Sequence, residues 1–167
     1  MKTMRLFPLE LRRLLQSRLT WLIMALTVLS PVLGLVLYKP ATSTTMLSMY
    51  LANPAIAGGV AGGILFGLLA IFELDRARRS RVDILTDAVV SPLTTALTRL
   101  LALLTAAVLT AGLTMLVWLP ISAGLIGSVF TGVNFLLAYL LLMGLALPLG
   151  ILAAAAAYQF TRRADLS

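Results

Sequence analysis

The chain has 167 residues, of which 60% are hydrophobic and only 11% are charged, and its mean hydropathy is +1.03. A soluble domain carries about 25% charged residues, so this chain lacks the charge to cover a globular surface in water. The formal charge of +7 would suit nucleic-acid binding, but the basic residues stand where apolar runs end and form no soluble basic face. The composition therefore predicts an integral membrane protein with no nucleic-acid partner.

The composition also argues against catalysis. The chain has no Cys and no His, which excludes disulfides and thiolate zinc sites and removes the commonest general base. The apolar runs hold no acid that could perform chemistry inside a membrane. We therefore expect no enzyme and no cofactor or metal site in this chain, and an intramembrane enzyme is the weakest alternative.

Residues 1–18 predict an amphipathic helix at the membrane surface. At 100° per residue, one stripe holds Phe7, Leu11, Leu14 and Leu15, while the arginines face away. A basic helix of this kind lies flat at the headgroups with its apolar face in the acyl boundary. The alternative is the basic region of a signal peptide, but no small-residue cleavage pattern follows the next apolar run.

The first two membrane helices are predicted over residues 19–72. The first run, residues 19–38, contains no charge and is long enough to span a bilayer, and Pro31 inside it predicts a kink. Residues 39–53 are polar and rich in Ser and Thr, so we expect a connection there. The second helix is then expected over residues 55–72.

The second span carries glycines at four-residue spacing in two overlapping rows. Glycine rows of this kind form a groove through which another membrane helix can approach closely. They predict a helix-packing face, with a merely flexible membrane helix as the alternative, and leave open whether the partner helix belongs to this chain. The residues of this face are Gly58, Gly59, Gly62, Gly63 and Gly67.

Residues 73–99 form a charged island between two apolar halves of the chain. Val82, Leu85 and Val89 recur at helical spacing, and Pro92 should end the helix because the residue before a proline avoids the helical region. We expect a short cytoplasmic helix followed by return to the membrane. The alternative is a solvated loop whose arginines anchor topology and contact anionic lipid.

Residues 100–161 contain no charge and predict the third and fourth membrane helices. The third is expected over residues 100–119. Pro120 and the glycines after it fit either a short external loop or a helix that continues before turning. The fourth is expected over residues 135–160, and residues 162–167 form a short tail.

The distribution of basic residues predicts the topology. Five precede the first span, five lie in the charged island and two follow the last span, whereas Lys39 alone lies on the other side. The positive-inside rule then places the island and both termini in the cytoplasm. The predicted fold class is an all-α membrane protein, with an N-terminal interfacial helix, four transmembrane helices and a short cytoplasmic helix between spans two and three.

The order of these elements resembles an ABC transporter permease of type 2. Permeases of that family carry an acidic–basic pair after the second span, a short helix ending in Leu, a Pro with polar residues, and a basic residue that opens the third span. The corresponding residues here are Asp75-Arg76, Asp83-Ile84-Leu85, Ser91-Pro92-Leu93-Thr94 and Arg99-Leu100-Leu101. The Gly common before that short helix is absent, and Arg79 and Ser80 stand in its region.

The resemblance implies that residues 1–18 act as an elbow helix and that the island contains a coupling helix for an ATP-binding cassette subunit. ATP and Mg²⁺ would bind that subunit, because the chain has no GxxxxGK[ST] loop. The family has six spans, so the chain is expected to be a fragment or a split subunit that pairs with a second permease subunit or further helices. The expected docking residues are Arg78, Arg79, Arg81, Val82, Leu85, Val89 and Pro92.

The sequence thus predicts a permease subunit in a bacterial plasma membrane, surrounded by lipid and driven by a separate ATPase. The alternative function is a non-transporting scaffold or accessory subunit of a larger membrane complex. The residues do not identify a substrate or a direction of transport.

Overall fold

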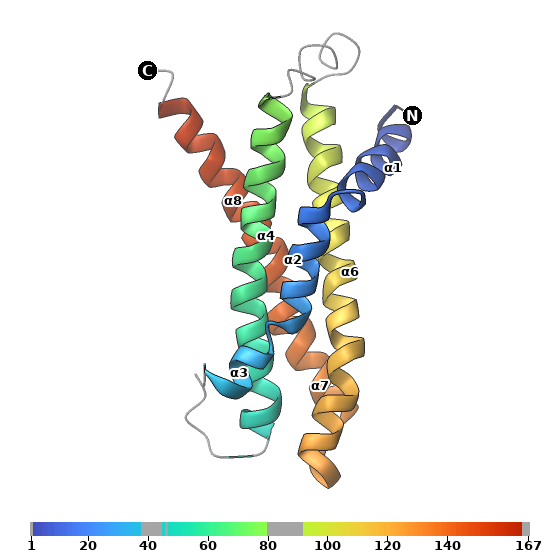
Figure 1. Ribbon diagram of the computed structural model, residues 1–167, viewed down its shortest axis with the longest axis vertical. Coiled ribbons are helices and arrows are strands. Elements are labelled where there is room, and N and C mark those ends of the chain that lie inside the picture. The colour runs from blue at the N-terminus through green and yellow to red at the C-terminus, as the bar shows by residue number, and fades with distance from the viewer. Residues whose placement is uncertain (1, 38–44, 46, 80–91, 165–167) are drawn as a thin grey trace.

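A computed structural model describes residues 2–37, 45, 47–79 and 92–164 (Figure 1). Within these ranges the chain is helical and contains no strand. Four helical segments are long and apolar enough to cross a membrane: Arg18–Val36, Met49–Arg76, Leu93–Val129 and Gly132–Thr161. The predicted all-helical membrane fold with four spans is therefore confirmed. The short cytoplasmic helix predicted between spans two and three lies outside the described residues.

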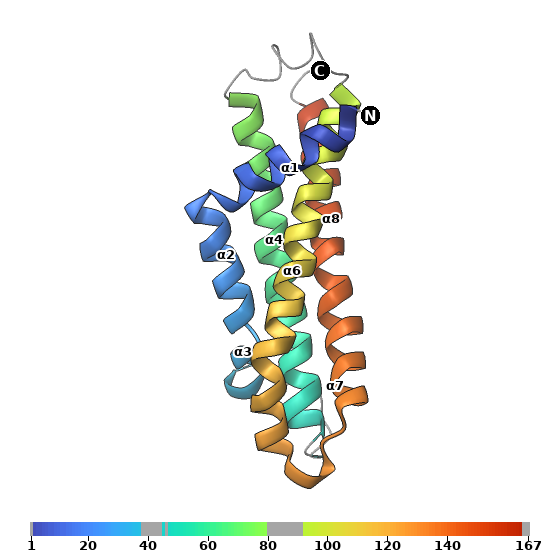
Figure 2. The ribbon, with the colours of Figure 1, turned by 90° about the vertical axis from the view of Figure 1, so that its right-hand side faces the viewer.

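Helix α1 (Lys2–Leu15) is amphipathic, as predicted, and its apolar stripe contacts the rest of the bundle. Leu14 is buried in the core, and Phe7, Leu11 and Leu15 pack against that core. The main partner of α1 is α6, which it crosses near one end of the bundle (Figure 2). The stripe therefore packs partly against α6, while the placement of this helix at the membrane surface stays a prediction.

The first span is broken in its middle. Helix α2 (Arg18–Leu29) ends at Ser30, and α3 (Val32–Val36) follows Pro31. Proline has no amide hydrogen to donate, so carbonyls in the preceding turn need other partners. Ser30 supplies two donors to the carbonyl of Thr27, through its amide at 3.2 Å and its hydroxyl at 2.6 Å. The kink predicted at Pro31 is therefore a stabilised helix break.

The second span starts earlier and ends later than predicted. A π-helical turn, η1 (Ser48–Ala52), leads directly into α4 (Asn53–Arg79). The polar connection is consequently shorter than residues 39–53, and helix α4 continues into the first part of the charged island. In the span that contains α4, 56% of the most apolar window is buried, against 28% in the last span. Helix α4 is therefore the central helix of the bundle.

The third span is a single long helix, α6 (Pro92–Ile126), which passes through Pro120. Of the two predicted alternatives, the continuing helix is the one found. It ends in a 3-10 turn, η2 (Gly127–Val129), where Gly127 has a φ of 66°, a conformation that favours glycine. The last span consists of α7 (Gly132–Ala138), the π-helical η3 (Tyr139–Gly144) and α8 (Leu145–Ala164).

The inner face of α6 is built from small side chains. Ala106, Ala107, Thr110 and Thr114 are all fully buried. The hydroxyl of Thr110 donates to the carbonyl of Ala106 at 2.7 Å, and that of Thr114 donates to the carbonyl of Thr110 at 2.8 Å. Threonine can therefore be buried here without an unsatisfied hydroxyl, because its own helix accepts the hydrogen bond.

Helix α1, the end of α4, the start of α6 and the end of α8 all lie at one end of the bundle (Figure 1). Helix α3, η1 and the turn after α6 lie at the opposite end (Figures 1 and 2). We call the first of these the charged end, since it holds the ion-paired residues Glu10, Arg13, Glu73, Arg76 and Arg99.

Candidate functional site

Glu73 is the central residue of an ionic cluster at the charged end. Its side chain is only 7% exposed, and it lies where the apolar part of α4 ends. One carboxylate oxygen accepts a hydrogen bond from the guanidinium of Arg13 at 2.9 Å, and the other lies 3.6 Å from that of Arg76. A carboxylate can be buried in this way only when charged partners compensate for its lost hydration.

Glu10 extends the cluster to a third helix. Its carboxylate lies 3.0 Å from the Arg13 guanidinium one turn along α1. Its other oxygen lies 3.6 Å from Nε of Arg99 on α6. We call the set of Glu10, Arg13, Glu73, Arg76 and Arg99 the ionic cluster; its five side chains join α1, α4 and α6.

The ionic cluster joins helices that lie on both sides of the predicted docking segment. Helix α4 ends at Arg79 and α6 begins at Pro92, so the cluster holds the two helices that flank residues 80–91. Arg13 is 37% exposed and Arg76 is 61% exposed, so their pairs are partly screened by solvent, whereas Glu73 is not. The cluster therefore positions α1 chiefly through Glu73.

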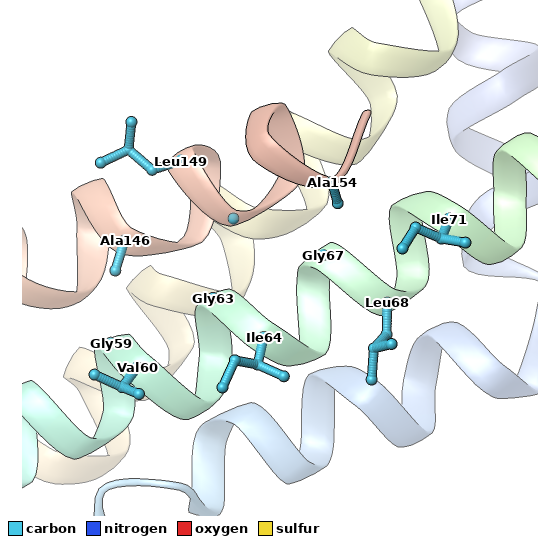
Figure 3. A pocket seen from close by; sticks show the side chains of 11 residues that line it. Gly59, Val60, Gly63, Ile64, Gly67, Leu68, Ile71, Ala146, Leu149 and Ala154 are labelled. Carbon is cyan, nitrogen blue, oxygen red and sulfur yellow. The ribbon is translucent and has the colours of Figure 1, made fainter. Parts of the chain in front are cut away.

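A second feature is the crossing of α4 and α8, where the two backbones touch. A Cβ at Gly150 of α8 would overlap the carbonyl oxygen of Gly63, and a Cβ at Gly59 would lie 2.5 Å from the carbonyl oxygen of Leu142. Gly67 continues this row toward Ala154. Figure 3 shows the glycines of α4 facing the α8 segment that carries Ala146 and Ala154. Only glycine permits this approach, which we call the glycine crossing.

The other glycine row of α4 meets different partners. Gly58 faces the ring of Pro31, with a Cβ position 3.0 Å from its Cγ. Gly62 lies between Thr27 and Leu147, with a Cβ position 2.9 Å from each. The two overlapping rows thus serve two interfaces within this chain, one with α8 and one mainly with the broken first span.

An open apolar groove runs along the glycine crossing (Figure 3). Its volume is about 540 Å³, and it is lined by α4 and α8 only. Exposed Val60, Ile64 and Leu68 form its edge on α4, and Leu149 forms part of its edge on α8. The groove exists because a row without side chains leaves space beside the two backbones.

The predicted docking residues are only partly within the described ranges. Arg78 and Arg79 belong to the last turn of α4, and Pro92 is the first residue of α6. Arg81, Val82, Leu85 and Val89 lie outside the described residues. The sequence reasoning did not single out Glu10, Arg13 and Glu73 as a set; an acid at the edge of an apolar run is the signal that could have found them.

The described residues offer no group of three or more Asp and Glu side chains that could hold a metal ion. The ionic cluster combines carboxylates with arginines, which suits a structural link or the binding of an anion better than cation binding. No family model, no curated protein and no solved structure matches the chain.

Proposed function

We propose that the chain is the permease subunit of an ABC-type transporter in a bacterial plasma membrane, with both termini cytoplasmic. A separate subunit would bind ATP and Mg²⁺, and a second permease subunit or further helices would complete the pathway. The proposal rests on the motifs at residues 75–101 and on one structural observation. That observation is the ionic cluster, which joins α1, α4 and α6 at the charged end.

The ionic cluster supports the proposal because a transporter must carry a displacement from a docking segment into its membrane helices. Residues 80–91 connect the end of α4 to the start of α6, so a partner that pushed on them would act on both helices. The Arg13–Glu73 and Glu10–Arg99 pairs would carry that displacement to α1. The three helices would then move as one unit at the charged end.

The glycine crossing supports the second requirement, a bundle with two alternative packings. Helices that interlock through large side chains resist displacement, because each side chain must leave its cavity. At Gly63 and Gly150 the contact is between backbones, so α8 can pivot on α4 with little repacking of side chains. The apolar groove beside the crossing provides space for that movement.

Reconstitution tests the proposal directly. The chain is purified from its native membrane in mild detergent with any ATP-binding subunit that accompanies it, and ATP hydrolysis is measured in vesicles. The variant Arg78→Glu/Arg79→Glu should abolish association and the ATPase activity that depends on it, because it reverses charge beside the docking segment. The matched control Arg162→Glu/Arg163→Glu reverses two charges at the same end of the bundle and should leave both intact.

Two results would contradict the proposal. One is recovery of the chain without any ATP-binding subunit in a detergent that preserves other membrane complexes. The other is a defect in assembly or abundance for the Arg78→Glu/Arg79→Glu variant with no change in any ATPase rate, which is the behaviour of a scaffold or accessory subunit.

A further inference from the structure

Three backbone carbonyls of the last span lie on the three glycines of the glycine crossing. A Cβ placed on any of these glycines would lie between 2.5 and 3.2 Å from one of the carbonyl oxygens. The pairs are Gly59 with Leu142, Gly63 with Ala146 and Gly67 with Gly150. Both sets repeat every four residues, and α4 and α8 both run toward the charged end (Figure 1). A displacement of α8 by four residues would therefore bring the carbonyls onto neighbouring positions of the same row.

The larger side chains of the last span follow the same repeat. Met143, Leu147 and Ile151 are fully buried at four-residue spacing. Met143 lies against Gly58, and Leu147 lies against Gly62. If α8 moved by four residues away from the charged end, Leu147 would take the place of Met143 and Ile151 that of Leu147. Exchanges between apolar side chains of similar volume are the core changes that proteins tolerate best.

The residues at the two ends of the glycine row determine the direction of such a displacement. One turn after Gly67 stands Ile71, so movement toward the charged end would press the backbone of Gly150 against a large side chain. One turn before Gly59 stands Ala55, which is fully buried and adds only a methyl group. Movement away from the charged end thus meets the smaller obstacle.

The last span is also longer than a bilayer requires. Gly132–Thr161 holds 30 residues and no charge, whereas about 20 residues span the hydrocarbon core. A displacement by four residues moves the helix about 6 Å along its axis, so an apolar segment still crosses the membrane. This span is the least buried of the four, so little of its surface has to exchange one neighbour for another.

We propose that α8 occupies two registers on α4, the observed one and a second that is displaced by four residues away from the charged end. In the second register Ala154 lies on Gly63 instead of Gly67. The carbonyl of Leu142 then meets the methyl group of Ala55, so the second register is the less populated of the two. The inference stands apart from the proposed transport function, because neither an ATP-binding subunit nor a substrate takes part.

Disulfide trapping of the full chain in lipid vesicles tests the proposal. In the observed register the Cβ position of Gly67 lies 3.5 Å from the Cβ of Ala154, which is within the range of a disulfide. Gly67→Cys/Ala154→Cys should therefore cross-link at once on mild oxidation. Gly63→Cys/Ala154→Cys should cross-link more slowly, because it traps only the second register. Gly59→Cys/Ala154→Cys joins positions that meet in neither register and is the control that should not cross-link.

The variant Ala55→Gly tests the obstacle to the second register. It removes the methyl group that faces Leu142 there, so it should raise the cross-linking rate of Gly63→Cys/Ala154→Cys at least about fivefold. The matched control Ala57→Gly removes a methyl group from another buried position of α4 and should leave that rate unchanged.

Spin labels at Phe72→Cys and Leu145→Cys measure the displacement without any change in the glycine row. Both positions are exposed, one toward the charged end of α4 and the other at the start of α8. The second register should add a distance that is longer by up to about 6 Å, and Ala55→Gly should increase its population. A single distance that Ala55→Gly does not alter would overturn the proposal, even if the cysteine variants in the glycine row fail to fold. Trapping of the Gly63 pair no faster than the Gly59 pair would overturn it as well.

Discussion

The indole nitrogen of Trp118 on α6 donates a hydrogen bond of 2.8 Å to the backbone carbonyl of Val28 on α2. Val28 lies three residues before Pro31, in the turn where the first span is broken. Backbone groups at such a break have no water to bind inside a membrane and need a partner from the protein. Trp118 is thus the side chain from another helix that stabilises the break.

Replacing Trp118 by Phe should lower the free energy of unfolding by about 1 kcal/mol, because Phe keeps most of the apolar contact but cannot donate to Val28. The matched control is Trp21→Phe. Trp21 also donates to a backbone carbonyl, that of Leu15, at 2.7 Å, but it is exposed near the end of a span. Its loss should change stability by less than about 0.5 kcal/mol. Chemical unfolding in mixed micelles measures both; equal effects would show that the Val28 bond adds no stability.

Introducing a methyl group at the glycine crossing should force α4 and α8 apart. We expect Gly150→Ala to destabilise the bundle by about 1–3 kcal/mol. The added Cβ would overlap the backbone carbonyl of Gly63, and relieving that overlap requires the two helices to move apart. Gly112→Ala in α6 is the control, because nothing lies within 4 Å of its Cβ position. That change should be neutral or stabilising by up to about 1 kcal/mol through helix propensity. If the unfolding midpoints of the two variants shifted by the same amount, the close packing of α4 against α8 would be contradicted.

Removing the charge of Glu73 should leave Arg13 with Glu10 as its one remaining counter-charge among the described residues. Glu73→Gln is expected to cost about 1–3 kcal/mol, less than a fully buried pair would, because Arg13 remains partly exposed. A double-mutant cycle with Arg13→Gln isolates the coupling of the two side chains. The corresponding cycle with Arg76→Gln should give less than about 1 kcal/mol, since Arg76 is largely exposed. Additive effects at Glu73 and Arg13 would show that the pair contributes nothing to stability.

The proposed orientation can be tested with single cysteines, because the chain has none of its own. Ser128 lies in the turn after α6, and Thr161 lies near the end of α8 at the charged end. In intact cells a membrane-impermeant maleimide should label Ser128→Cys, whereas Thr161→Cys should react only after permeabilisation. Labelling of Thr161→Cys from outside would place the charged end on the external side, against the positive-inside rule.

The glycine rows show how far the sequence could predict the packing. Four-residue spacing is a local property and can be read directly from Gly59, Gly63 and Gly67. The identity of the partner is not local, since any helix with a small residue at the contact can approach such a row. Gly150 and Ala154 of α8 supply that surface, and nothing in the spacing of the α4 glycines specifies them.

The ionic cluster was harder to predict for the same reason. Glu73 and Arg76 are three residues apart in one helix, so their pairing follows from helical geometry. Arg13 is sixty residues away from Glu73 along the chain, and their contact depends on how α1 lies across the bundle. The sequence predicted an amphipathic α1 but not the helix it crosses, so it could not bring Arg13 to α4.

The position of α1 has a consequence for synthesis of the protein. Its apolar stripe packs against α6, and its Glu10 and Arg13 pair with Arg99 and Glu73, all of which are made after it. Helix α1 therefore cannot make these contacts until α4 and α6 have been synthesised and inserted. During that interval its amphipathic character allows it to bind the membrane interface. The same pattern of residues thus serves first as a temporary membrane anchor and later as a tertiary contact.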